Sequence, residues 1–268
     1  IIKVGGLGQL RASLPPEFFS LTNITIKQFI NWFFTIVPIW FIAMTLYQRI
    51  FATKDVKDAK KAFYIAGILE YPIMAFLGVV LGMVSRVFFP GVEAEMGLPM
   101  LLRDILPIGV TGIIISAYFS AIMSTADSCL IASSGNFVND IIERYFMKGA
   151  SDKKIMKISQ VVTLIIGVVT VVIASQFETV LEIILHAYSF MVAGLLVPTL
   201  FAYFSKNHDP LAALLSMLSG GVFTLVVIFT KLTIIPGVDA TIFGLALSFA
   251  VYIIVAFFNK ASRKSING

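Results

Sequence analysis

Three oxygen-bearing groups that could bind a cation lie within five residues of this sequence, at Ala121, Ser124 and Thr125. Residues three and four positions apart share one face of an α-helix. A helix here would therefore bring the Ala121 carbonyl and both hydroxyl groups together. Hard cations take oxygen ligands of this kind, and polar groups within a bilayer are costly unless they are satisfied or used. The run is a candidate site for a small cation such as Na⁺.

The elements around this run are apolar helices long enough to cross a membrane. The chain is 58% hydrophobic and 13% charged, whereas soluble domains average about 25% charged residues. A span needs about 20 apolar residues. Seven stretches meet this requirement, and they predict an all-α integral membrane protein without a soluble domain: residues 26–47, 62–86, 108–133, 158–176, 181–204, 210–232 and 240–259.

The sequence shows no sign of covalent chemistry. The single cysteine, Cys129, excludes an intrachain disulfide, and its place in an apolar helix is that of a small filler. No stretch resembles a nucleophile elbow or a cluster of metal-ligating side chains. We therefore expect that the protein is not an enzyme.

Basic residues alternate between the connections and predict the orientation of the spans. One set of connections, which includes the C-terminal tail, holds fourteen Lys and Arg residues, and the other set holds six. Basic connections stay in the cytoplasm. This predicts a multi-pass protein of the plasma (cytoplasmic) membrane, with the start of the chain on the extracytoplasmic side and its end in the cytoplasm. The net charge of +5 reflects this asymmetry, so we do not expect a nucleic-acid partner.

The start of the chain predicts a truncated protein with an external leading segment. Ile1 is not an initiating Met, and no signal peptide follows it, so we expect that upstream spans are missing. Residues 1–25 contain Pro15-Pro16 and lack a helical period, which predicts an extracytoplasmic loop.

Two features of the first two spans suggest polar sites. Pro38 lies inside the first span, where it removes a hydrogen-bond donor and predicts a break or kink; the break could expose backbone to a solute or serve packing alone. Glu70 lies in the second span, where a carboxylate usually faces the bundle interior or a pathway. Gly78 and Gly82 have the spacing for close helix contact.

A packing role is the main alternative for the cation site. Small residues recur at every fourth position of the third span, and such a stripe lets a neighbouring helix approach: Gly112, Ser116, Ser120, Ser124, Ser128 and Ala132. Packing does not account for Thr125 or Asp127. Asp127, Ser128 and Glu70 are therefore further candidates for an ion or proton site.

Two segments together resemble the sodium:solute symporter family. The segment SAYFSAIMSTADSCLIASSGNFVNDI, residues 116–141, is similar to the family's signature of small residues, a Ser-Ser/Thr core and a terminal Asp-Ile. Residues 47–62, with Gln48-Arg49 and a basic tail after a helix that contains Trp40, are similar to its sixth core helix and the following loop. The two segments occur in the right order and at the right spacing.

The resemblance implies a LeuT-type fold, which is built from two inverted repeats of five helices. Residues 1–25 would be an extracytoplasmic loop and residues 26–204 the core helices 6 to 10. Residues 205–259 would be two additional helices and residues 260–268 a cytoplasmic tail. The first repeat, the missing N-terminal half of the same protein, would be a partner of this chain.

The resemblance also implies a sodium-coupled symporter of a small organic solute, working by alternating access. Ala121, Ser124 and Thr125 would be sodium ligands, and the others would come from the absent first core helix, so this chain alone should bind Na⁺ poorly. The substrate candidates are Thr35, Pro38, Trp40, His186 and Tyr188. Sugar transporters of the family have an aromatic pair near Trp40, and Ile39 stands in the place of one member. This puts a sugar in doubt and leaves the solute open.

Two alternatives remain. A proton-coupled transporter of the same fold would use Glu70, Asp127 or His186 as the proton carrier, although Ser124 and Thr125 suit Na⁺ and do not titrate. A symporter-like module of a sensor is the other alternative. The tail after Asn259 has nine residues, so no fused kinase is expected unless the C-terminus is also cut.

Overall fold

The computed structural model describes residues 4–20, 22–177, 179–206 and 208–266, and the side chains as far as residue 259 except Tyr71. The regular secondary structure of these residues is helical, without a strand, and turns and irregular segments connect the helices. The elements in chain order are α1 Leu7–Ser13, η2 Pro16–Phe19, α2 Ile26–Ile36, α3 Ile39–Ile42, α4 Met44–Phe51, α5 Val56–Leu69, η3 Glu70–Ala75, α6 Phe76–Phe88, α7 Ala94–Ile105, α8 Ile108–Asn136, η4 Phe137–Phe146, α9 Asp152–Ala174, α10 Val180–Phe204, α11 Pro210–Thr230 and α12 Ala240–Ile266.

Seven stretches of helix in the described residues are long and apolar enough to cross a membrane, which confirms the predicted number. Four of them extend clearly beyond the predicted bounds at one end or both: Ile26–Phe51, Val56–Phe88, Ile108–Phe146 and Asp152–Ala174. Hydropathy marks the apolar core of a span, whereas a helix continues into the polar flanks until a cap or turn ends it. For example, the side chain of Asp55 accepts a hydrogen bond from the Asp58 N–H and starts α5 before the apolar stretch.

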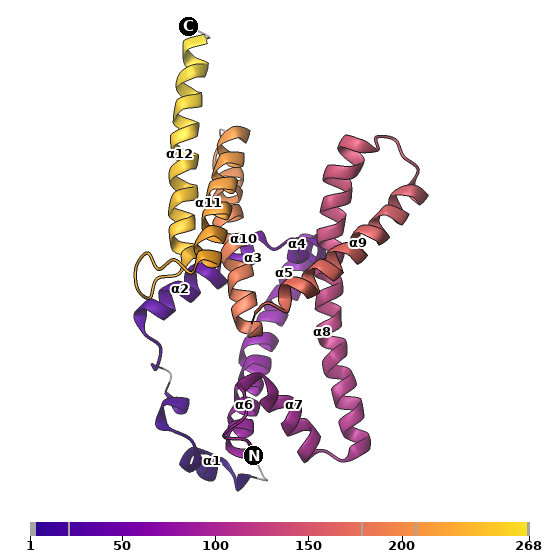
Figure 1. Ribbon diagram of the computed structural model, residues 1–268, viewed down its shortest axis with the longest axis vertical. Coiled ribbons are helices and arrows are strands. Elements are labelled where there is room, and N and C mark those ends of the chain that lie inside the picture. The colour runs from indigo at the N-terminus through magenta and orange to yellow at the C-terminus, as the bar shows by residue number, and fades with distance from the viewer. Residues whose placement is uncertain (1–3, 21, 178, 207, 267–268) are drawn as a thin grey trace. The chain divides into compact units, whose positions relative to one another are not determined.

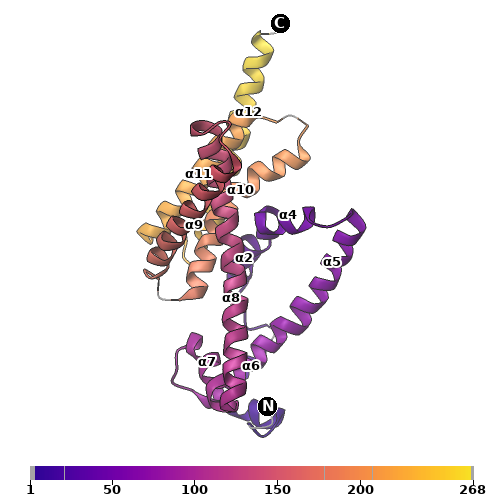
Figure 2. The same cartoon turned by 90° about the vertical axis from the view of Figure 1, so that its right-hand side faces the viewer.

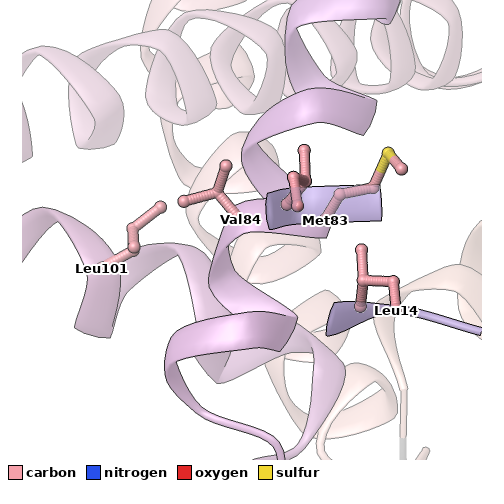
Figure 3. Close-up of a cluster of buried hydrophobic side chains, with 5 residues drawn as sticks. Leu14, Met83, Val84 and Leu101 are labelled. Carbon is pink, nitrogen blue, oxygen red and sulfur yellow. The ribbon is translucent and has the colours of Figure 1, made fainter. Parts of the chain in front are cut away.

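The leading segment is not irregular throughout, contrary to the expectation for residues 1–25. It contains the helix α1 and the 3₁₀-helix η2, which starts at Pro16. Leu10 and Leu14 of this segment are buried against Met83 and Val84 of α6 and Leu101 of α7 (Figure 3). Seven residues are too few to show a clear helical period, and α1 owes its place to this tertiary packing.

The described chain divides into two compact units. The first comprises residues 1–21 and 44–177 and contains α1, η2 and the elements from α4 to α9. In it α8 continues into η4 as one long rod, which Figure 2 shows along its length. A turn then leads to α9, which crosses α8 (Figure 1). Within the same unit, α6 and α7 approach closely at Gly97, because a Cβ there would collide with Ser85 Oγ.

The second unit comprises residues 22–43 and 178–268 and packs α2 and α3 with α10, α11 and α12. The last three helices lie side by side (Figure 1). Glycines allow their backbones to touch: a Cβ at Gly220 would collide with the Ala193 carbonyl oxygen, and one at Gly244 with Thr224 Oγ1. Small residues at such contacts are how helices associate in lipid.

The expected glycine contacts lie elsewhere. An added Cβ at Gly78, Gly82 or Gly112 would meet no atom within 4 Å. Close approach at these positions was therefore a wrong expectation for the described residues. Spacing shows that a helix has a small face, but which face meets a neighbour depends on the tertiary arrangement.

The predicted break at Pro38 is confirmed. Helix α2 ends at Ile36, and Pro38 caps the short α3. A second interruption follows at Ala43, where the backbone is extended with φ −68° and ψ 112°. The boundary between the two units falls immediately after Ala43, so one apolar span contributes helix to both units.

A candidate cation site and a polar pocket

The three candidate cation ligands meet on one face of α8. Ser124 Oγ donates a hydrogen bond of 2.9 Å to the Ala121 carbonyl oxygen, and Thr125 Oγ1 donates a longer one of 3.5 Å to the same atom. The i, i+3 and i+4 spacing therefore brings one carbonyl and two hydroxyl oxygens together, as the sequence predicts. All three residues are exposed.

The convergence at Ala121 differs from the other hydroxyl contacts of α8. Serine side chains in apolar helices commonly donate to the carbonyl one turn back, as Ser120 does to Ser116 and Ser128 does to Ser124. Each of those carbonyls receives one hydroxyl. Along α8, which is described without gaps, the Ala121 carbonyl alone receives two. Packing of a small-residue stripe does not require this arrangement.

The two carboxylates considered as ion or proton carriers are exposed in the described structure, contrary to the expectation of burial. Glu70 lies where α5 continues into the π-helix η3, and Asp127 lies on α8 one turn beyond Ser124. No residue is buried in the most apolar 18-residue stretch of the second span or of the third span. The two carboxylates share this exposure. Ser128 Oγ donates its hydrogen bond to the Ser124 carbonyl oxygen and not to the Asp127 carboxylate.

The substrate candidates lie in the second unit, where one of them belongs to a buried network. Thr35 of α2 and Thr241 of α12 share a hydrogen bond of 3.0 Å, and Thr241 donates to Ser189 of α10 at 2.7 Å. Ser189 in turn donates to the Leu185 carbonyl oxygen at 2.8 Å. These hydroxyl contacts join three helices inside the unit.

The same face of α2 is tied to the connection between α11 and α12. Lys27 Nζ donates to the Pro236 carbonyl oxygen, and Asn31 Nδ2 donates to that of Gly237. Asn31 Oδ1 also accepts from the Asp239 N–H at 3.2 Å. Lys27, Asn31 and Thr35 follow one another at intervals of four and form a polar stripe along α2.

A cavity of about 330 Å³ lies beside this network. It is lined by both apolar and polar groups, including Glu182, His186, Ser189 and Asp239. His186 Nε2 is 3.5 Å from Glu182 Oε1, one turn away on α10. Partial burial raises the pKa of the Asp239 carboxyl above its ordinary value of 3.8, and His186 opposes this shift. Two carboxylates beside one imidazole make the cavity a place for a cationic group.

The remaining substrate candidates are separated from this cavity. Ile39 is buried with Ile42 and Val192, and Tyr188 packs against that cluster. Trp40, the next residue, is 44% exposed. Pro38 is buried at the start of α3 and shapes the backbone. Of the five candidates, His186 alone lines the cavity.

Sequence reasoning missed several polar residues that the structure brings together, namely Asn31, Glu182, Ser189, Asp239 and Thr241. The four-residue spacing of Lys27, Asn31 and Thr35 was a signal that α2 has a polar face. The partners of that face lie about 200 residues later in the chain, and no local pattern indicates them.

The helices and polar groups define a class, a multi-spanning membrane protein with clusters of oxygen-bearing groups on its helices. Comparison with known families narrows this class. Residues 20–220, well over half of the chain, match the family model of the sodium:solute symporter family. The chain therefore belongs to this family, and the resemblance inferred from residues 116–141 and 47–62 is confirmed. Members of the family are transporters and not enzymes.

Several curated proteins are similar to the chain. It is 29% identical over 224 residues to the osmoregulated proline transporter OpuE of Bacillus subtilis, which covers 81% of this chain and 45% of the relative. It is 25% identical to the sodium/glucose cotransporter of Vibrio parahaemolyticus, over 79% of this chain and 42% of the relative. It is 31% identical to the sodium/pantothenate symporter of Haemophilus influenzae, over 64% and 36%. The chain thus spans less than half the length of these relatives.

Proposed function

We propose that this chain is part of a sodium-coupled symporter that moves a small organic solute across the membrane by alternating access. The observation that carries the sodium assignment is the convergence of the Ser124 and Thr125 hydroxyls on the Ala121 carbonyl oxygen. The family and two of the relatives, the sodium/glucose cotransporter and the sodium/pantothenate symporter, support the same ion.

Sodium binding requires a modest rearrangement of these groups. In the described state the hydroxyl protons point at the Ala121 carbonyl oxygen, whose lone pairs a cation would use. Rotation of the two hydroxyls leaves three oxygens facing one point, and the hydroxyl lone pairs then face it as well. Three ligands from one helix are too few for a dehydrated cation, so the rest come from another part of the full transporter. We propose that a helix outside this chain supplies them.

Coupling then follows from differential affinity. An ion held between α8 and a second helix outside this chain stabilises the arrangement in which the ligands of both helices are close together. Ion binding therefore shifts the conformational equilibrium. Inward movement of one Na⁺ provides about 2.3 kcal/mol per 100 mV of membrane potential. In this proposal the chain contributes the second inverted repeat of a LeuT-type fold and two further helices, with the basic connections in the cytoplasm.

We propose a solute with a cationic nitrogen, such as an amino acid. The cavity beside Ser189 presents the carboxylates of Glu182 and Asp239, which suit an ammonium group better than a neutral sugar. Ile39 packs into the core beside Trp40, so the aromatic pair expected of sugar transporters is incomplete. The relative OpuE is a proline transporter.

Uptake into proteoliposomes tests this function. The intact protein is reconstituted and given an imposed Na⁺ gradient, with a K⁺ gradient as the control, and labelled amino acids, quaternary amines, sugars and vitamins are offered. We expect accumulation with Na⁺ alone and a preference for a nitrogen cation. Accumulation driven equally by a pH gradient contradicts sodium coupling, and a preference for sugars contradicts the proposed solute class.

A further inference from the structure

The turn between η4 and α9 holds a shallow, open cavity of about 380 Å³. It is lined by Asn139, Glu143, Arg144, Lys148 and Gly149. Gly149 has φ +76°, a left-handed conformation that glycine adopts readily, and it folds the chain back toward α9. The cavity therefore lies where η4 turns into α9, at one end of a hairpin formed by α8, η4 and α9. Figure 1 shows the course of this hairpin.

Basic side chains outnumber acidic ones around this cavity. Residues 139–157 contain five basic and three acidic side chains. The ion pairs of the described residues are Arg103–Asp104 and His186–Glu182, so Arg144 and Lys148 belong to none of them. The lining itself holds two cationic side chains, Arg144 and Lys148, against one carboxylate, that of Glu143, and it includes the Asn139 amide. An anionic group is the complementary occupant.

Aromatic residues next to the cavity indicate its level relative to a bilayer. Tyr145 is 69% exposed and Phe146 is 79% exposed, and the Arg144 guanidinium carbon lies 5.9 Å from the centre of the Tyr145 ring. Exposed aromatic side chains beside basic ones are typical of the membrane interface. A cavity beside such side chains is suited to the level of lipid headgroups.

An apolar groove lies further along the same hairpin, between α8 and α9. It encloses about 850 Å³ and includes Leu130, Ser133 and Gly167 in its lining. An added Cβ at Gly167 would meet Leu130 at 3.9 Å, so this glycine keeps the groove open without a tight contact. Ser133 is about three helical turns from Arg144, roughly 15 Å along the axis. An acyl chain crosses a similar depth, half of a hydrocarbon core of about 30 Å.

We propose that this hairpin binds an anionic phospholipid. Arg144 and Lys148 hold the phosphate, which a guanidinium recognises through two parallel hydrogen bonds, and the Asn139 amide donates to it as well. One acyl chain lies in the groove beside Gly167. A zwitterionic lipid places a cationic choline or amine next to these basic side chains and binds more weakly. Basic pockets on the cytoplasmic side of membrane proteins recognise anionic headgroups in this way.

Lipid retention tests the headgroup pocket independently of transport. The intact protein is reconstituted in symmetric nanodiscs of phosphatidylglycerol or phosphatidylcholine, returned to detergent, and analysed by mass spectrometry for bound lipid. We expect stronger retention of phosphatidylglycerol than of phosphatidylcholine. Arg144→Gln/Lys148→Gln should lower the affinity for phosphatidylglycerol roughly 25-fold, since each basic residue near the surface contributes roughly fivefold. Lys57→Gln/Lys60→Gln, which removes two exposed basic residues outside the cavity, should leave it unchanged.

A second pair of variants tests the groove. Gly167→Phe fills it and should reduce lipid retention several-fold, whereas Gly167→Ala should not. Inorganic phosphate at millimolar concentration should compete poorly, because it lacks acyl chains. Equal retention of the two lipids, unchanged retention in the Arg144/Lys148 variant or in Gly167→Phe, or full displacement by phosphate each overturns the proposal. Since the readout is bound lipid, none of these results depends on sodium coupling.

Discussion

Thr35 and Thr241 share a buried hydroxyl–hydroxyl hydrogen bond of 3.0 Å across 206 residues of sequence. It joins α2 to α12, and Thr241 passes the contact on to Ser189 of α10. The bond belongs to the polar stripe of α2 that also includes Lys27 and Asn31. A hydroxyl network in this place ties the first half of the first span to the last span of the chain.

Removal of this bond should destabilise the second unit. Thr241→Val leaves Thr35 and Ser189 without their shared partner, and buried hydroxyls that lose a partner cost about 1–3 kcal/mol. A double-mutant cycle with Thr35→Val should give a coupling energy of roughly 0.5–1.5 kcal/mol, the range for hydrogen bonds between membrane helices. Unfolding in mixed micelles with increasing denaturant measures both values. Strict additivity of the two substitutions would show that the bond contributes nothing.

The glycines of α11 and α12 should be far less tolerant than those of the second and third spans. Gly220→Ala and Gly244→Ala place a methyl group against Ala193 and Thr224, and overpacking of this kind costs about 1–3 kcal/mol. Gly78→Ala and Gly112→Ala enter open space and remove a weak helix former. Thermal unfolding of the four variants separates the two pairs. Equal stability of all four variants would contradict the close contacts at Gly220 and Gly244.

Ser248 should be replaceable by alanine with a gain in stability. Its hydroxyl is buried and has no hydrogen-bond partner among the described residues. Alanine removes the cost of desolvating that group, about 1–3 kcal/mol, and leaves the packing against Gly220 unchanged. We expect a higher midpoint of thermal unfolding for Ser248→Ala than for the parent protein. A lower midpoint would show that the hydroxyl has a partner in the working protein.

The raised pKa of Asp239 predicts a stability that falls as the pH rises. The folded state binds the proton more tightly than the unfolded state, whose Asp239 titrates near 3.8. The stability that the protonated Asp239 contributes is therefore complete below pH 3.8 and is lost as the pH rises through the higher pKa of the folded state. Asp239→Asn should flatten the dependence in this window, as measured by thermal unfolding at a series of pH values. A profile unchanged by the substitution excludes Asp239 as its origin.

Local patterns predicted much of this molecule. The seven spans follow from hydropathy because bilayer thickness sets the length of an apolar helix. The break at Pro38 follows from the chemistry of proline, and the meeting of Ala121, Ser124 and Thr125 follows from helical spacing. Each of these depends on residues close together in the chain.

Long-range features could not be predicted in the same way. The close contacts at Gly220 and Gly244, the partners of Asn31 and the exposure of Glu70 all depend on which helices become neighbours. The short helix α1 is also a product of tertiary packing, through Leu10 and Leu14. A single sequence shows the periodicity of each helix face, but it does not show which helix packs against that face.

The proton-coupled alternative makes a different prediction from the sodium site. Asp127→Asn and Glu70→Gln remove the exposed carboxylates of the second and third spans that were proposed as carriers. Because Ser124 and Thr125 do not titrate, we expect both variants to keep uptake driven by a Na⁺ gradient. Uptake that follows an imposed pH gradient in the parent protein and is lost in either variant would support proton coupling.

The most direct test of the account is the Na⁺ activation curve of solute uptake in paired α8 variants. Ser124→Ala and Thr125→Ala each remove one hydroxyl from the Ala121 carbonyl, whereas Ser120→Ala removes a matched hydroxyl that bonds to Ser116. We predict that the Na⁺ concentration for half-maximal uptake rises at least tenfold in the first two variants and stays unchanged in Ser120→Ala. The same curve for all four proteins would contradict a sodium site at Ala121, Ser124 and Thr125.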